Sequence, residues 1–253
     1  MGFEFLLIDQ PAEGVALITL NRPRSRNALT LDMQAELNEA LRQMERDEAV
    51  RAIVITGADK SFCAGYDLHE MKDMSADALV LAQLRREPWI WYTATHPKPL
   101  IGAINGAAHG VGAIIATALD IRVGCAATEF RYTAVAYGGA NNTWQLPPVV
   151  GLAKAKEFLL TGRRVGAEEA IQAGLLNHLV SPEELVAKAV EIAALIAANP
   201  PEGVRWHKAL IHAHLGHGYE EAYRAENAVM MNELRPRPPA EIFSGFLAKH
   251  PGS

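Results

Sequence analysis

The fold is decided by the stretch Ile104-Asn105-Gly106-Ala107-Ala108-His109-Gly110-Val111-Gly112-Ala113, near the middle of the chain. One apolar run, residues 99–104, leads into it, and another, residues 113–119, follows it. This order predicts a buried strand, a tight turn and a buried helix. Small residues at the helix start leave backbone N–H groups uncovered, which favours binding of an anion or a developing oxyanion. Close packing of the helix on the strand needs the same small residues, so this stretch alone leaves both interpretations open.

Length and composition indicate a soluble globular protein. The 253 residues suffice for one large domain, or a domain with a subdomain, and 49% hydrophobic with 21% charged residues is an ordinary balance for such a fold. A net charge of −5 argues against a nucleic-acid partner, and no apolar run is long enough to span a membrane. Two cysteines and no recognisable signal peptide lead us to expect a cytoplasmic location.

Apolar patterning alternates between strand and helix up to about residue 180 and is helical beyond it. Strands are expected at residues 3–9, 15–20, 52–56, 99–104, 120–126, 129–132 and 175–180. Thr30 is expected to cap a helix over 31–45, and Pro88 to kink or start a helix within 78–95. The pattern predicts an α/β core with a helical C-terminal extension.

Several common catalytic and metal-binding patterns are missing. The spacing of Gly106, Gly110 and Gly112 fits neither a P-loop nor a dinucleotide-binding loop. The cysteines lack zinc-site spacing, and there is neither a His-Glu-x-x-His motif nor a serine-hydrolase elbow. We therefore expect no metal and no separate cofactor. The C-terminal histidines are best explained as an exposed helix face: His207, His212, His214 and His217.

A second loop of small residues, Phe62-Cys63-Ala64-Gly65-Tyr66-Asp67-Leu68, follows a predicted buried strand. Two N–H groups from separate loops can converge on one carbonyl oxygen and stabilise an enolate or a tetrahedral oxyanion there. A thioester suits such an arrangement because its carbonyl is easily polarised. The two loops together therefore favour the oxyanion interpretation over packing alone.

Motifs along nearly the whole chain resemble the crotonase superfamily (enoyl-CoA hydratase/isomerase). They occur in the order Asn21-Arg22-Pro23, Asn27-Ala28-Leu29, Ser61 to Leu68, Pro97 to Gly106, Asp120-Ile121-Arg122, Leu160-Thr161-Gly162-Arg163, Glu168-Glu169-Ala170 and Gly174-Leu175. The resemblance implies a spiral of ββα units over residues 1–190, with a helical trimerisation region over 191–253. It also implies an acyl-CoA thioester as ligand, with coenzyme A as part of the substrate, and a homotrimer or dimer of trimers.

Site residues follow from the same resemblance. The backbone N–H groups of Tyr66 and Val111 would form the oxyanion hole, with Gly110 beside the substrate. The loops from Arg24 to Ala28 and from Ala64 through Asp67 to Leu68 would border the pantetheine and adenine. Lys249 would help to bind the nucleotide phosphates of a neighbouring subunit. Asp67 is expected to cap or anchor its loop and not to act as a base.

The chain departs from the family at both positions where its hydratases carry catalytic glutamates. These positions hold Ile114 and Ala134, and neither side chain can transfer a proton. We therefore expect an acyl-CoA-processing enzyme that stabilises a thioester enolate without the two-glutamate mechanism. Isomerisation, dehalogenation and C–C cleavage stay open, as does a non-catalytic acyl-CoA-binding pseudoenzyme.

Other residues are candidates for handling a proton or a water. In order they are Glu87, Tyr137, Asn142 and a bound water. Glu87 could equally be an exposed helix glutamate, and Tyr137 a packed aromatic residue. Asn142 stands where the 4-chlorobenzoyl-CoA dehalogenase branch has an aspartate, and its amide can orient a water or a polar substrate group. His109 is expected to be hydrogen-bonded in the core.

Overall fold

The computed structural model describes residues 2–72, 74–216, 218–229 and 232–233. The chain divides into two compact units, Met1–Pro201 and Glu202–Ser253. Lys249 and His217 lie outside the described residues, and the side chain of Glu87 is likewise outside the description. Among the helices of the described part, none is long and apolar enough to cross a membrane.

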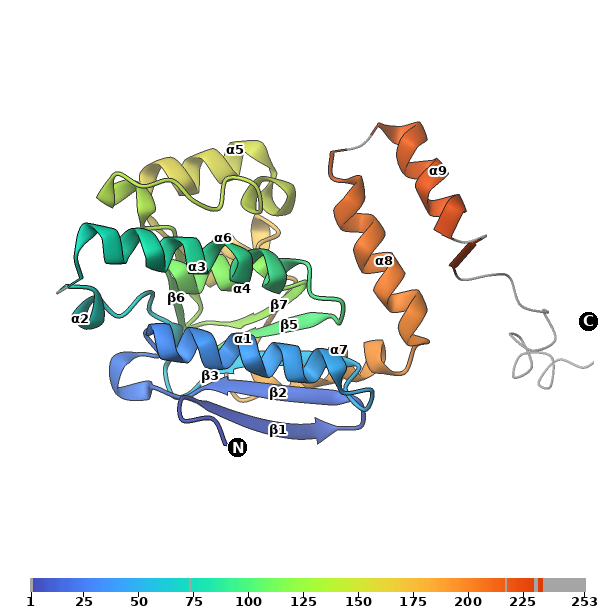
Figure 1. Ribbon diagram of the computed structural model, residues 1–253, viewed down its shortest axis with the longest axis horizontal. Helices are drawn as coiled ribbons and strands as arrows, with labels where there is room; N and C mark the ends of the chain where they lie inside the picture. The colour runs from blue at the N-terminus through green and yellow to red at the C-terminus, as the bar shows by residue number, and fades with distance from the viewer. Residues whose placement is uncertain (1, 73, 217, 230–231, 234–253) are drawn as a thin grey trace, which may run out of the picture. The chain divides into compact units, whose positions relative to one another are not determined.

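The first unit is built on two sheets (Figure 1). The larger has the strand order β1 (Leu6–Ala12), β2 (Val15–Leu20), β3 (Ala52–Gly57), β5 (Leu100–Ile104), β7 (Ile121–Cys125) and β10 (His178–Val180). The smaller has the order β4 (Ser61–Cys63), β6 (Ala107–His109), β8 (Glu129–Arg131) and β9 (Arg164–Gly166). Only the β1–β2 and β8–β9 pairs are antiparallel among the pairs of these described strands.

A strand of the larger sheet repeatedly runs into a strand of the smaller one: β3 into β4, β5 into β6 and β7 into β8. Helices follow each pair: first α2 (Leu68–Met71) and α3 (Ala76–Ala94), next α4 (Val111–Ala118), then the 3₁₀ turn η2 (Ala134–Tyr137) and α5 (Leu146–Thr161). This repetition confirms the predicted spiral of ββα units. It places the ends of β4 and β6 side by side, because these two strands pair in parallel.

The stretch that decides the fold contains one element more than expected. Residues 107–109, predicted as part of a turn, form β6, because they pair with β4 on one side and β8 on the other. Asn105 holds the preceding turn: its amide donates to the carbonyls of Gly57 (2.8 Å) and Asp59 (2.9 Å) and accepts from the Gly57 N–H. The chain thus passes from one sheet to the other before α4 begins.

Helix boundaries follow the sequence closely, with one exception. The Thr30 hydroxyl caps α1 (Leu31–Arg46) by accepting from the Met33 N–H at 3.2 Å. Helix α3, in contrast, runs through Pro88 without ending there. The residues after Pro88 pack Trp89 and Ile90 into the core, which compensates for the backbone hydrogen bond that proline removes.

The remaining helices show where the core ends. Helix α6 (Ala167–Gln172) precedes β10, and the 3₁₀ turn η1 (Pro23–Ser25) follows β2. Helix α7 (Leu185–Ala197) packs its buried Leu185, Ala189 and Ala193 in one cluster with side chains of the larger sheet. The first unit therefore includes α7 and ends at Pro201. The second unit contains α8 (Pro201–His214), which begins at the boundary, and α9 (Tyr219–Val229).

Candidate active site

The loop after β4 and the loop before α4 meet at two glycines. A Cβ placed on Gly110 would lie 3.7 Å from the Gly65 Cα and 3.2 Å from the Thr133 Oγ1. Gly110 has φ 52° and ψ −120°, a conformation that only glycine adopts without strain, and Gly65 has φ 111°. The two loops therefore approach each other at the glycines that precede Tyr66 and Val111, and the pairing of the Tyr66 and Val111 N–H groups stays a prediction.

The N-terminus of α4 has no side-chain cap, because Gly110 is its N-cap residue. Val111 is the first helical residue, so the helix itself supplies no acceptor for its N–H. Contact between α4 and β4 is tight: a Cβ on Gly112 would lie 2.2 Å from the Cys63 carbonyl oxygen. Glycine at position 112 thus sets how near the helix start lies to the loop that carries Tyr66.

Backbone pairing orients Tyr66. The Leu29 N–H donates to the Gly65 carbonyl (2.8 Å), and the Asp67 N–H donates to the Leu29 carbonyl (3.0 Å). In this parallel bridge the bonds come from the residues on either side of Tyr66, so its own N–H points away from Leu29. The phenol lies 3.5 Å from the Gln34 side chain, at the limit of a hydrogen bond.

Arg22 and Asp67 join the loops that follow β2 and β4. The Arg22 guanidinium donates to the Asp67 carboxylate at 3.0 Å and also to the Ala28 carbonyl. Asp67 caps α2 by accepting from the His69 N–H at 3.0 Å, which confirms its expected anchoring role. Burial alone would raise the pKa of Asp67, but the hydrogen bonds from Arg22 and from the α2 backbone outweigh this and lower it.

The predicted coenzyme A loops lie together. The Ala64 N–H donates to the Arg26 carbonyl at 3.0 Å, and Asn27 donates to the carbonyls of Ala58 (2.9 Å) and Ser61 (2.7 Å). Arg24 is exposed in η1, Ala28 is buried, and Leu68 is 70% exposed at the start of α2. The loops at residues 24–28 and 64–68 therefore lie side by side.

By the family resemblance, the positions at which hydratases carry their two catalytic glutamates are those of Ile114 and Ala134. Ile114 is buried in the first turn of α4, and Ala134 begins η2. Tyr137 ends η2 with 81% of its surface exposed, so the alternative of a packed aromatic residue is wrong. Asn142, in contrast, is only 3% exposed. Of the proton-handling candidates that the structure describes, Asn142 is the buried one.

His109 forms a hydrogen bond with a residue of the neighbouring strand. Its Nε2 lies 2.8 Å from the Glu129 carboxylate on the neighbouring strand β8, which confirms the expected hydrogen bond, although the residue is only partly buried. Burial lowers the pKa of His109, and Glu129 offsets only part of that effect. Glu129 is thus a structural partner that fixes the orientation of the imidazole. Among the described residues, no group of three or more His, Cys, Asp or Glu side chains is arranged to hold a metal.

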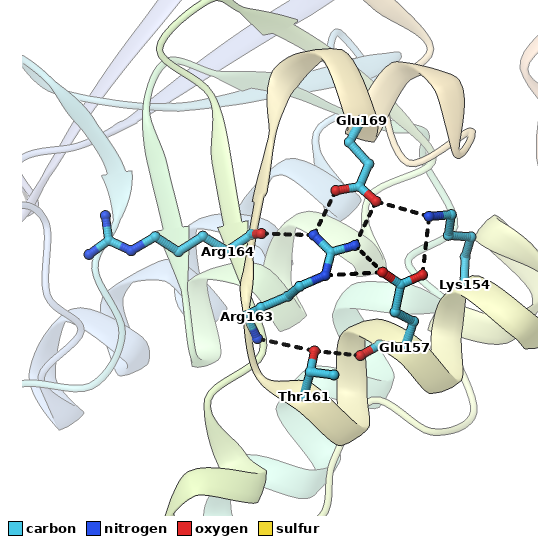
Figure 2. Close-up of polar contacts among 6 residues, drawn as sticks. All are labelled: Lys154, Glu157, Thr161, Arg163, Arg164 and Glu169. Atoms are coloured by element: carbon cyan, nitrogen blue, oxygen red, sulfur yellow. Dashed lines mark hydrogen bonds and ion pairs between the residues drawn. The ribbon is translucent and has the colours of Figure 1, made fainter.

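A surface network explains the motif at residues 160–163 (Figure 2). Arg163 donates to both Glu157 and Glu169, and Lys154 donates to the same two carboxylates at 3.1 and 2.9 Å. Hydrogen bonds from Arg163 and Lys154 lower the pKa of Glu169 to about 2. The network joins α5 to α6 around β9 and has a structural role.

Comparison with known proteins decides the family. The family model described as enoyl-CoA hydratase/isomerase matches residues 10–238. The chain belongs to the enoyl-CoA hydratase/isomerase family. A crystal structure of enoyl-CoA hydratase from Bacillus anthracis is 31% identical with a TM-score of 0.92, and the match covers 97% of each chain. The crotonase fold expected from the sequence is thereby confirmed.

Curated relatives in this family differ in the reactions that their names give. Short-chain-enoyl-CoA hydratase of Clostridium acetobutylicum is 36% identical over 78% of this chain and 77% of its own length. The 1,2-epoxyphenylacetyl-CoA isomerase of Escherichia coli is 34% identical over 79% of both chains. Names of this kind support an enzyme of the enoyl-CoA hydratase/isomerase family, and they leave its exact reaction open.

Sequence reasoning missed two residues beside Asn142. Thr117 on α4 accepts a hydrogen bond from the Asn142 amide at 3.2 Å, and Gln145 is buried in the following turn. A threonine within an apolar helix and a glutamine before Leu146-Pro147 carry little signal alone. Only the spiral brings them together, because α4 and the segment after η2 belong to successive ββα units.

Proposed function

We propose that the protein processes acyl-CoA thioesters by stabilising an enolate between the backbone N–H groups of Tyr66 and Val111. The observation that supports this proposal is the close approach of the two loops at Gly65 and Gly110, where a Cβ added to Gly110 would lie 3.7 Å from the Gly65 Cα. In such a site the N–H groups gain strength as negative charge develops on the thioester oxygen, and loss of one donor typically reduces the rate by about 10²–10³-fold.

Coenzyme A would lie along the loops at residues 24–28 and 64–68. Their mutual hydrogen bonds and the Arg22–Asp67 ion pair support a preformed surface beside Tyr66. Leu68 and Arg24 offer an apolar and a cationic contact for the pantetheine and the nucleotide. Lys249 would add a phosphate contact from a neighbouring subunit of a trimer or dimer of trimers.

The reaction would not use two glutamates as general acid and base. Ile114 and Ala134 occupy the positions in question, and a proton can only be moved by a titratable group or a water within hydrogen-bond reach. Glu87, Tyr137 and Asn142 remain the candidates, with a bound water as the fourth. Asn142 cannot itself take a proton, so its contribution would be to orient a water or a polar group of the substrate.

Turnover assays test this function. The purified protein is incubated with enoyl-CoA and 3-oxoacyl-CoA thioesters of varied chain length, and consumption is followed by chromatography. We expect turnover of at least one thioester. Tight binding of CoA esters without any turnover would support the pseudoenzyme instead, and no binding of any CoA ester would overturn both.

A further inference from the structure

Three buried polar groups near α4 have no hydrogen-bond partner within the described part of the chain. They are the Asn142 Oδ1, both amide atoms of Gln145 and the indole Nε1 of Trp89. Asn142, Gln145 and Trp89 are 3%, 7% and 4% exposed. A buried polar group left unpaired costs about 1–3 kcal/mol, so several of them together indicate that something else satisfies them.

The donors and acceptors around Thr117 determine which atom of the Asn142 amide has no hydrogen-bond partner. The Ala113 carbonyl can only accept, so the Thr117 hydroxyl must give it its single proton, at 2.7 Å. The same oxygen therefore accepts from the Tyr132 hydroxyl at 2.9 Å and from Asn142 at 3.2 Å. Burial raises the pKa of Tyr132 to about 12, which keeps its proton available. Asn142 thus presents its NH₂ group to Thr117 and its acceptor oxygen elsewhere.

The segment that carries Asn142 and Gln145 contacts α4, the helix that begins at Val111, through Asn142 and Thr117. Thr117 follows Ile114 by three residues, so it lies about 4.5 Å further along α4 and about 9 Å beyond Val111. The Leu146 N–H donates to the Asn142 carbonyl, which closes a turn with Asn142 and Gln145 three residues apart. Trp144 in that turn contacts Trp91 of α3, with ring centroids 5.6 Å apart. The segment of residues 142–145 therefore meets α3 and α4 further along α4 than Ile114, the position where hydratases of the family carry a glutamate.

The unpaired atoms need both a donor and an acceptor. The Asn142 Oδ1 and the Gln145 Oε1 each need a donor, whereas the Gln145 NH₂ and the Trp89 N–H need an acceptor. A ketone or a carboxylate only accepts and would leave both amide oxygens unpaired. An ammonium only donates and would leave the Gln145 NH₂ and the Trp89 N–H unpaired. A hydroxyl on an acyl chain does both, since it donates its one proton to one of the two oxygens and accepts two hydrogen bonds.

We propose that Asn142 and Gln145 bind a hydroxyl group carried by the acyl chain of the substrate. The proposal rests on the acyl-CoA function above and specifies its substrate class. With the thioester oxygen at Val111, the hydroxyl lies several carbons beyond the carbonyl, on the far side of Ile114. Thr117 and Tyr132 act as positioning residues, because they hold the Asn142 amide in the orientation that the hydroxyl requires.

Calorimetric titration of the full chain tests this with saturated acyl groups, which offer no double bond to hydrate. The probes are hexanoyl-CoA and its 4-, 5- and 6-hydroxy derivatives. We expect at least one hydroxy derivative to bind about tenfold more tightly than hexanoyl-CoA, as one or two new hydrogen bonds to buried amides would give. Equal binding of all four would overturn the proposal, because a buried water would then satisfy the amides, while the acyl-CoA function would stand.

Gln145→Met separates recognition from folding. Both amide atoms of Gln145 are unpaired in the free protein, so this variant should keep or raise the melting temperature while the preference for the hydroxy derivative disappears. Gln43→Met, the same change on the exposed surface of α1, should keep the preference. Retention of the preference in Gln145→Met would contradict the proposal. Absence of binding to every CoA ester would overturn the inference together with the function on which it rests.

Discussion

At the scale of single residues, glycine determines the geometry of the candidate site. Gly112 has no room for a side chain, since an added Cβ would lie 2.2 Å from the Cys63 carbonyl oxygen. Backbone atoms cannot move aside as a flexible side chain would. An alanine here must therefore shift the start of α4 away from the loop that carries Tyr66.

Gly112→Ala tests this dependence. We expect about 1–3 kcal/mol of destabilisation, the usual result of overpacking. Displacement of the Val111 N–H should also lower kcat/KM for a thioester substrate by about 10²-fold or more. Urea unfolding and steady-state kinetics measure the two effects. Gly203→Ala is the control, because its Cβ would meet nothing within 4 Å, and both quantities should stay unchanged or improve. Wild-type kinetics in Gly112→Ala would refute the link.

The Arg22–Asp67 pair gives a prediction with a defined pH dependence. The pKa of Asp67 is lower in the folded protein than its ordinary value of 3.8, so its contribution to stability is present above that value and is lost as the pH falls through the folded pKa. Asp67→Asn should destabilise the protein by about 1.5–3 kcal/mol at pH 7, as for a hydrogen bond to a charged group. The gap between variant and wild type in urea unfolding should narrow below about pH 4. A gap that is constant from pH 7 to pH 3 would argue against the ion pair as its cause.

At the scale of elements, α4 is held at the end opposite the site. Arg122 is completely buried at its guanidinium and donates to the carbonyls of Ala116, Leu119 and Leu175. Burial lowers the pKa of Arg122, and the electrostatic interactions with Tyr132 and Asp120 offset part of this effect. The guanidinium thus satisfies carbonyls at the C-terminus of α4 and fixes the helix along its axis.

Arg122→Lys should be far from conservative. An ammonium cannot reach three carbonyls in the directions of a planar guanidinium, so we expect about 2–3 kcal/mol of destabilisation by urea unfolding. Arg164→Lys in β9 serves as the matched control. It should change the free energy of unfolding little, because the Arg164 side chain that pairs with Glu129 is 66% exposed to solvent. Similar stability of Arg122→Lys and wild type would show that α4 does not depend on this contact.

Most elements were predictable because their signals are local. The Thr30 cap, the buried run of β3 and the helix start at Gly110 each follow from a few adjacent residues. Strand β6 was not predictable, since Ala107–His109 becomes a strand only through pairing with β4 and β8. The continuity of α3 through Pro88 likewise depends on tertiary packing.

The anchoring role of Asp67 was predictable from the sequence, and the structure confirms it. The assignment of Tyr66 and Val111 came from the family resemblance and stays a prediction. The Thr117–Asn142–Tyr132 network was not visible, because its members are up to 25 residues apart and lie in α4 and in two segments outside the helices and strands. Pairing across a spiral brings such residues together without leaving a local pattern.

At the scale of the whole molecule, we expect self-association. The resemblance to crotonases implies a trimer or a dimer of trimers, and Lys249 would serve a neighbouring subunit. Light scattering coupled to size exclusion should give three or six times the chain mass of 27.5 kDa. A monomer at all concentrations would contradict this expectation and would remove Lys249 from the site of a partner.

The central claim is that a thioester carbonyl lies between the N–H groups of Tyr66 and Val111. Infrared difference spectroscopy of an acyl-CoA with a ¹³C-labelled thioester carbonyl observes that bond directly. Two hydrogen bonds should polarise the carbonyl, so its stretching band should move to lower wavenumber on binding, and the shift should diminish in Gly112→Ala. A bound thioester whose band stays at its position in water would contradict the account.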